Sequence, residues 1–224
     1  MTSFKIANVM PEAIGIYELA KSNHNEYKNH ILNIIKLASK DFRREARTGT
    51  PLYHICSKKD QNLFLNFPEL SHLHSEIISN ALSYFNLTGF SCENVVVTDA
   101  WLNVGKKGAK LHWHNHTNAY ISGTYYVNFD PKKHSLLGFK NDRLNSNIDR
   151  PSITIPVDTT KKTVYNSPVL QVGTAEGTIL YWKSHLVHGY DIPNNSDDRI
   201  TLSFNIMPKE CTDGDIFSFK VVAD

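Results

Sequence analysis

The sequence predicts a mainly β protein with helices in its first third, in which antiparallel strands form a sandwich or barrel. Residues 1–90 contain two apolar patterns with helical spacing, whereas the chain from Glu93 onward is rich in β-branched and aromatic residues. The later strand candidates are short, are separated by Gly, Pro, Asn and Asp, and have no long helical pattern between them. Because parallel sheets need crossover helices, this order favours an antiparallel architecture.

Two segments have the apolar spacing of amphipathic helices. Residues 26–44 repeat apolar side chains every three or four positions, and Asn23 with Glu26 is a candidate capping pair before them. A second apolar face covers residues 69–87, where Pro68 precedes the helix at a tolerated position. We expect both apolar faces to pack into the core.

The strands begin at Val95–Val97, which lead into the segment AWLNV, and Gly105–Gly108 then marks a turn. The polar stretch 134–166 resembles a long insertion between two core strands, a place where substrate contacts often lie. We therefore predict a single domain, 1–224, with a helical support layer at 1–90, a β core at 91–210 and the insertion at 134–166. The further strand candidates are 109–116, 119–129, 152–156, 169–172, 177–182, 185–190 and 199–207.

Composition excludes several classes of protein. The 224 residues are 41% hydrophobic and 21% charged, with 24 Lys and Arg against 22 Asp and Glu, so the net charge is only +2. A nearly neutral chain gives no strong signal for nucleic acid, and no apolar run is long enough to span a membrane. The first residues lack a secretory signal pattern, and three scattered cysteines do not make a disulfide scaffold. We expect a cytoplasmic protein.

Histidines at alternating positions are the first sign of chemistry. His112, His114 and His116 lie two residues apart, and alternate side chains of a strand share a face. Two of these imidazoles can therefore bind one metal ion, although a solvated polar face would give the same pattern. Downstream, His188 is the better candidate for a distant ligand because Gly189 leaves room beside its ring. His185 is expected to be a structural or substrate-side residue.

A second candidate site residue is Arg199, in a strand with alternating apolar side chains. Because Ile200, Leu202, Phe204 and Ile206 alternate, Arg199 and Thr201 share the opposite face. A guanidinium fork beside a hydroxyl suits a carboxylate, which it can bind with two hydrogen bonds. The pattern also fits a surface arginine at the end of a turn.

Together these motifs resemble a known family. The segment from His114 to Val127, HNHTNAYISGTYYV, followed by His188 and Arg199, is similar to the 2-oxoglutarate/Fe(II)-dependent oxygenases with an H-x-H…SG-x-YY pattern, found in bacteria and phages. The resemblance covers about residues 100–207. It implies a double-stranded β-helix, a cupin-like jelly roll with helices packed on one sheet.

The resemblance also implies a role for individual residues. His114, His116 and His188 match the metal ligands. Arg199 and Thr201 match the pair that holds the distal carboxylate of 2-oxoglutarate, to which Tyr126 is expected to contribute. Asn103 is expected near the other end of the co-substrate.

One departure concerns the second ligand, where the wider superfamily has Asp or Glu and this chain has His116. An all-histidine site lacks one negative charge compared with the usual two-histidine, one-carboxylate triad. Two alternatives stay open: a carboxylate bridged through water, from Asp130 or Asp191, or ligation by His112 and His114 while His116 caps the loop at Thr117-Asn118.

The expected function is that of a dioxygenase that uses Fe(II) and 2-oxoglutarate, hydroxylates an unidentified small molecule or protein, and releases succinate and carbon dioxide. The resemblance leaves a homodimer open. Two other functions fit the sequence: a cupin-like three-histidine enzyme that does not use 2-oxoglutarate, and a non-catalytic jelly-roll binding module.

Overall fold

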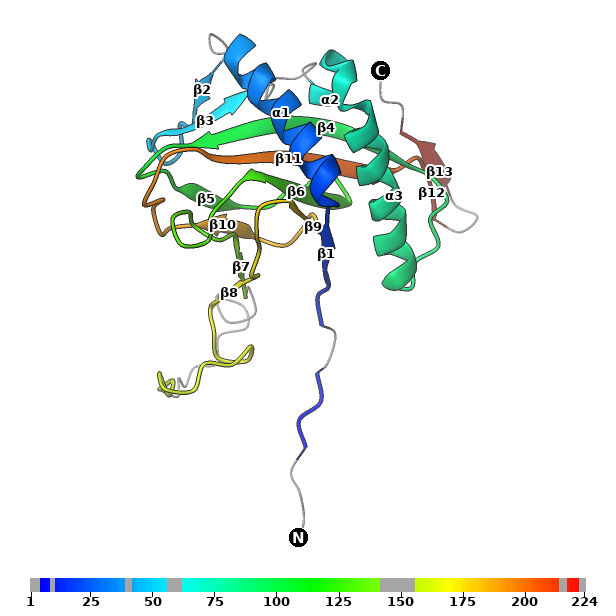
Figure 1. Ribbon diagram of the computed structural model, residues 1–224. Coiled ribbons are helices and arrows are strands. Elements are labelled where there is room, and N and C mark those ends of the chain that lie inside the picture. The colour runs from blue at the N-terminus through cyan, green and yellow to red at the C-terminus, as the bar shows by residue number, and fades with distance from the viewer. Residues whose placement is uncertain are drawn as a thin grey trace.

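Two antiparallel sheets and a layer of helices make up the protein (Figure 1). The computed structural model describes residues 5–8, 11–38, 42–55, 62–141, 156–213 and 217–221. Within these ranges no helix combines the length and apolar character that crossing a bilayer requires.

The larger sheet has seven strands, and each pair of neighbours in it runs antiparallel. Its long central strands carry the core, and short strands form both edges. In spatial order the strands are β1 (Ile14–Glu18), β9 (Thr178–Lys183), β6 (Ile121–Asn128), β11 (Arg199–Pro208), β4 (Val95–Gly105), β3 (Leu52–Ile55) and β2 (Arg43–Arg44).

The smaller sheet has four short strands, in the order β5 (Leu111–His114), β10 (His188–Tyr190), β7 (Gly138–Lys140) and β8 (Val169–Gln171). Side chains from both sheets, including Tyr126 and Trp182 from the larger and Phe139 and Tyr190 from the smaller, form a second apolar cluster between them. A separate ribbon pairs β12 (Glu210–Asp213) with β13 (Phe217–Lys220).

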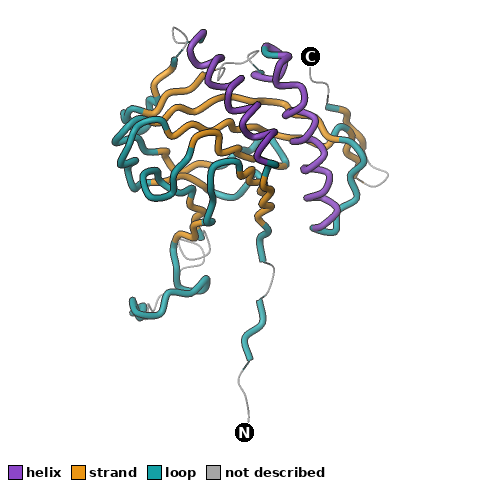
Figure 2. Tube along the Cα trace, in the orientation of Figure 1, coloured by secondary structure: helices purple, strands orange, loops and turns teal. Residues whose placement is uncertain are grey.

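The helices α1 (Lys21–Leu37) and α3 (Ser71–Leu87) cover the outer face of the larger sheet, as Figure 2 shows, with the short α2 (Leu63–Asn66) and a 3₁₀ turn at Pro68–Leu70 before α3. The apolar face of β11, which includes Ile200, Leu202 and Phe204, packs in the main core with these helices. Residues of β11 at the alternate positions face the space between the sheets. The alternation expected for this strand is therefore confirmed.

The predicted class, mainly β with helices on one sheet, is correct, but the boundaries of the first helix are wrong. Helix α1 begins at Lys21 after Ala20, without a side-chain cap, so the predicted cap at Asn23 lies inside the helix. Its start is set by tertiary contacts, since the buried His24 ring lies 2.7 Å from the Tyr125 hydroxyl. Its predicted end is also too late, because Arg43 and Arg44 pair with β3 as a strand.

Most of the predicted strands are present, with bounds that differ by a few residues. The segment 185–190 is a turn followed by β10, residues 152–155 lie outside the described residues, and residue 156 is not in a strand. Strand β7 lies within the predicted insertion. The sequence analysis did not identify β1, β2, β3, β7, β12 or β13, and the predicted division into segments stays a prediction.

Candidate metal centre

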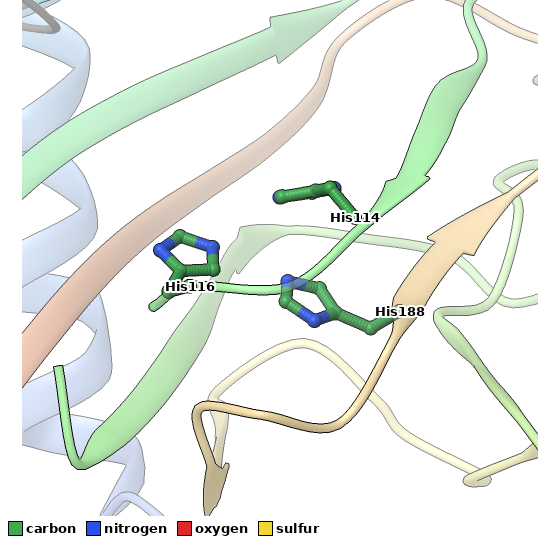
Figure 3. Close-up of side chains that lie close together, drawn as sticks. All are labelled: His114, His116 and His188. Carbon is green, nitrogen blue, oxygen red and sulfur yellow. The ribbon is translucent and has the colours of Figure 1, made fainter. Parts of the chain in front are cut away.

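Three histidines converge at one place in the fold, as Figure 3 shows. His114 ends β5, His116 follows two residues later, and His188 begins β10 directly opposite His114 in the ladder. One ring nitrogen from each of the three lies within 4.8 Å of the others. The structure thus brings together the three residues that the sequence analysis named as metal ligands.

Backbone carbonyl groups fix the orientation of two of these rings. Nδ1 of His114 lies 2.9 Å from the carbonyl oxygen of His112, and Nδ1 of His188 lies 2.9 Å from that of Leu186. Because a carbonyl oxygen only accepts, each Nδ1 carries the proton and each Nε2 keeps a free lone pair. Histidine ligands of metals are commonly oriented by such a second hydrogen bond.

Burial keeps these imidazoles neutral, the form that binds metal. Burial lowers the pKa of His188 to about 3 and the pKa of His116 to about 4, and nearby histidines add to both shifts. Burial likewise lowers the pKa of His114 below its ordinary value. Three uncharged, converging imidazoles are a suitable donor set for a divalent transition metal such as iron.

No carboxylate joins this cluster within the described ranges. Asp130 caps the backbone N–H of Lys132 and pairs with Lys133, and Asp191 accepts a hydrogen bond from the Trp113 indole. Neither aspartate lines the cavity beside the histidines. Among the described residues that line this cavity, the acidic one is Glu45, from the connection between β2 and β3.

His112 lies beside the cluster without being part of it. Its ring stacks on His114 with centroids 4.5 Å apart, while its Nε2 accepts from the Arg47 guanidinium and its Nδ1 lies 3.8 Å from Glu45. His185 is on an exposed turn, 3.3 Å from Glu12. At Gly189 an added Cβ would meet the carbonyl oxygens of Leu111 and His112 at 2.9 and 2.8 Å, so this glycine admits the β5 backbone. The expected room beside the His188 ring stays a prediction.

A cavity of about 380 Å³ opens beside the histidines, and Arg199 lies on its wall. The side chain is buried, with its guanidinium carbon 4.7 Å from the Tyr190 ring centroid and its Nε donating to the carbonyl oxygen of Ser135 at 3.0 Å. Among the described residues, no carboxylate pairs with this cation. The buried Tyr190 hydroxyl also lacks a partner there. A buried cation and an unpaired hydroxyl on one wall are the surroundings that a bound carboxylate would complete.

The other predicted co-substrate residues lie on neighbouring strands. Thr201 lines the cavity and pairs in register with Asn103 on β4 and with Tyr126 on β6. Tyr126 is fully buried behind the cavity wall, where the Arg199 guanidinium carbon is 5.6 Å from its ring centroid. Asn103 lines the cavity, but its amide is hydrogen-bonded to other side chains.

Sequence reasoning missed Glu45, His54 and Trp101, which all line the cavity. His54 reaches it because β3 pairs with β4, opposite Asn103. That pairing joins segments about 50 positions apart and leaves no local pattern, so only the alternation from Trp101 to Asn103 could have indicated one of the three.

Comparison with known proteins supports the family resemblance and the fold. Residues 99–205, just under half of the chain, match the family described as "Putative 2OG-Fe(II) oxygenase", which confirms the resemblance to these oxygenases. The matched segment contains the three histidines and Arg199. No curated protein matches the chain significantly.

Solved structures share the fold at low sequence identity. AviO1 from Streptomyces viridochromogenes Tue57 is 18% identical with a TM-score of 0.57, over 88% of this chain and 90% of that one. The non-heme alpha-ketoglutarate-dependent epimerase SnoN from nogalamycin biosynthesis is 14% identical with a TM-score of 0.62, over 88% and 77%. A Pseudomonas putida prolyl-4-hydroxylase is 9% identical with a TM-score of 0.56, over 88% and 93%. These likenesses confirm the double-stranded β-helix.

Proposed function

We propose that the chain is a dioxygenase dependent on Fe(II) and 2-oxoglutarate that hydroxylates its substrate and releases succinate and carbon dioxide. The observation that carries the proposal is the position of Arg199. This buried cation, without a carboxylate partner among the described residues, lines the same cavity as the three histidines. A metal site alone would not require a buried cation there, but an anionic co-substrate does.

Each part of the cavity has a role in this reaction. His114, His116 and His188 would hold the iron, and three histidine ligands leave positions open for co-substrate and dioxygen. Arg199 and the Thr201 hydroxyl would hold the distal carboxylate of 2-oxoglutarate. The iron supplies the oxidising chemistry when it is loaded, while the protein orients the reactants and excludes water.

Anaerobic titration with Fe(II) and then 2-oxoglutarate tests the proposal directly. A keto acid chelated to ferrous iron gives a visible charge-transfer band, so we expect such a band to grow and saturate at one equivalent per chain. Admission of air should then yield succinate. The His185→Ala variant is a control and should give the same band, whereas iron binding without a band would exclude 2-oxoglutarate as the co-substrate.

Hydroxylation is the finer part of the proposal, since the shared fold also occurs in a protein named as an epimerase. Once a substrate is found, mass spectrometry under labelled dioxygen distinguishes the outcomes. Hydroxylation adds one labelled oxygen atom to the product, whereas epimerisation leaves its mass unchanged. The proposal also includes an unidentified substrate, either a small molecule or a protein side chain. It further includes a cytoplasmic location and the formation of a homodimer.

The three-histidine donor set favours one second candidate, a cupin-like metal enzyme that does not use 2-oxoglutarate. In that case the chain would bind iron, and 2-oxoglutarate would neither shift its spectrum nor be consumed. A non-catalytic jelly-roll module would retain no iron after desalting.

A further inference from the structure

A chain of hydrogen bonds links Glu45, in the connection between β2 and β3, to hydroxyl groups on β11. The Glu45 carboxylate lies 3.1 Å from Nε2 of His54, and Nδ1 of His54 lies 2.7 Å from the Asn103 side-chain oxygen. The Asn103 amide nitrogen then donates to the hydroxyls of Thr201 at 3.3 Å and Ser203 at 2.9 Å. All of these residues line the cavity.

The Trp101 indole settles which way the Asn103 amide faces. Its Nε1 lies 3.1 Å from the Asn103 Oδ1 position, and an indole nitrogen can only donate a hydrogen bond. The atom at that position must therefore be the oxygen, since a flipped amide would set two donors against each other. Because the same oxygen faces Nδ1 of His54, that ring nitrogen must carry a proton.

The contact with Glu45 requires a proton on Nε2, the other ring nitrogen of His54. Burial opposes the charge of this carboxyl, but the backbone N–H of Arg47 and the His54 ring outweigh burial and hold the pKa of Glu45 below its usual value. An ionised carboxylate only accepts hydrogen bonds, so Nε2 of His54 must donate to it. With both ring nitrogens facing acceptors, His54 has the hydrogen-bond geometry of an imidazolium.

We propose that Glu45 and His54 form a partly buried carboxylate–imidazolium pair that positions Asn103 and, through it, the Thr201 hydroxyl and the Trp101 ring. The Asn103 oxygen accepts from two partners and its nitrogen donates to two, so the amide is fully used within the protein. Asn103 is accordingly a positioning residue and not a contact of the co-substrate.

The Glu45–His54 pair has two consequences, one for the co-substrate site and one for the metal site. Because Asn103 donates to the Thr201 oxygen, the hydroxyl proton of Thr201 stays available for an acceptor in the cavity, which is the 2-oxoglutarate carboxylate if the proposed function holds. The Trp101 ring, held by the same amide, stacks on His116 with centroids 5.9 Å apart and planes 19° apart. The pair therefore couples the connection between β2 and β3 to the proposed co-substrate anchor and to one proposed metal ligand.

The proton count can be measured on the unaltered protein. In the full-length chain loaded with diamagnetic Zn(II) and labelled with ¹⁵N-histidine, we expect two ring N–H signals from His54 at neutral pH, assigned by their loss in His54→Gln. A single ring N–H on His54 would overturn the imidazolium pair, and this outcome does not depend on whether the protein uses 2-oxoglutarate.

Variants then test whether the pair acts through Asn103. We expect Glu45→Gln and His54→Gln to raise the dissociation constant for 2-oxoglutarate about tenfold, the effect of losing one charge-assisted hydrogen bond, and to shift the charge-transfer band, with iron affinity unchanged. Arg43→Ala is the matched control, because this exposed residue is opposite His54 in the β2–β3 ladder but does not line the cavity.

The decisive comparison is a double-mutant cycle. In an Asn103→Ala background, His54→Gln should have no further effect on 2-oxoglutarate affinity if His54 acts through the amide. Additive effects, or an unchanged affinity in both single variants, would overturn the inference. If instead the wild-type chain binds iron without 2-oxoglutarate, the proposed function fails, while the NMR proton count still decides the state of the pair.

Discussion

His114 on β5 and His188 on β10 are direct partners across the antiparallel ladder, with ring centroids 4.4 Å apart. The two residues are 74 positions apart in the chain, and the pairing of two short strands brings their rings together. Because backbone hydrogen bonds between β5 and β10 position both residues, one imidazole ring can be replaced without disrupting the strand pairing.

His114→Ala or His188→Ala should therefore abolish iron binding with little loss of fold. Each variant loses one of three imidazole ligands while its backbone hydrogen bonds remain. Iron content after anaerobic loading and desalting, together with circular dichroism, measures both effects. His185→Ala is the control, because His185 is exposed on a turn; iron retained in the His188 variant but lost in this control would make His185 the ligand.

His116 and not His112 should be the third ligand. A nitrogen of His116 lies within the cluster, whereas the His112 ring is engaged by Arg47 and lies near Glu45. We expect His116→Ala to lose iron and His112→Ala to retain it. His116→Asp should also retain iron, since it restores the usual carboxylate, and the rate of succinate formation without substrate would then report uncoupled turnover. The reverse pattern in the two alanine variants would assign ligation to His112.

Gly189→Ala should weaken iron binding although Gly189 supplies no ligand atom. The added Cβ would lie 2.8 Å from the His112 carbonyl oxygen, a backbone atom, so β10 must move away from β5. That movement separates His114 from His188, and we expect an affinity loss of about tenfold or more, which is about 1.4 kcal/mol. Gly173→Ala, where an added Cβ meets nothing within 4 Å, is the matched control. Equal affinities in the two variants would contradict the proposed role of this close approach.

The parts of the site that could be predicted from sequence are those governed by local alternation. The shared face of Arg199 and Thr201 follows from the two-residue period of a strand. His116 was predicted on the same basis, although it lies just beyond the end of β5. The pairing of strands that are distant in the chain could not be predicted in this way. His54 enters the cavity only because β3 lies beside β4, and nothing in the local sequence encodes that register.

Arg199→Met should weaken 2-oxoglutarate binding and spare iron. Methionine keeps much of the packing against Tyr190 but removes the charge, so the co-substrate carboxylate loses its partner. Truncating one member of a buried charge pair costs roughly 2–5 kcal/mol, and anaerobic titration of the charge-transfer band measures the loss. Lys106→Met is the control, because this lysine pairs with Asp198 on the surface. An unchanged affinity in the Arg199 variant would favour the three-histidine enzyme that does not use 2-oxoglutarate.

Without metal, the folded protein should lose stability as the pH falls below about 6.5, and the buried histidines should account for part of that loss. The pKa of His188 is about 3 and that of His116 about 4 in the folded chain, against an ordinary value of 6.5. Below pH 6.5 the unfolded state therefore binds protons that the folded state does not, which favours unfolding until the pH reaches the folded values. Each such histidine contributes a slope of at most about 1.4 kcal/mol per pH unit. Urea denaturation of the metal-free chain at pH 7 and pH 5 measures the slope, which should be smaller in His188→Gln and unchanged in His185→Gln; equal slopes in both variants would mean that the His188 ring is protonated in the folded chain.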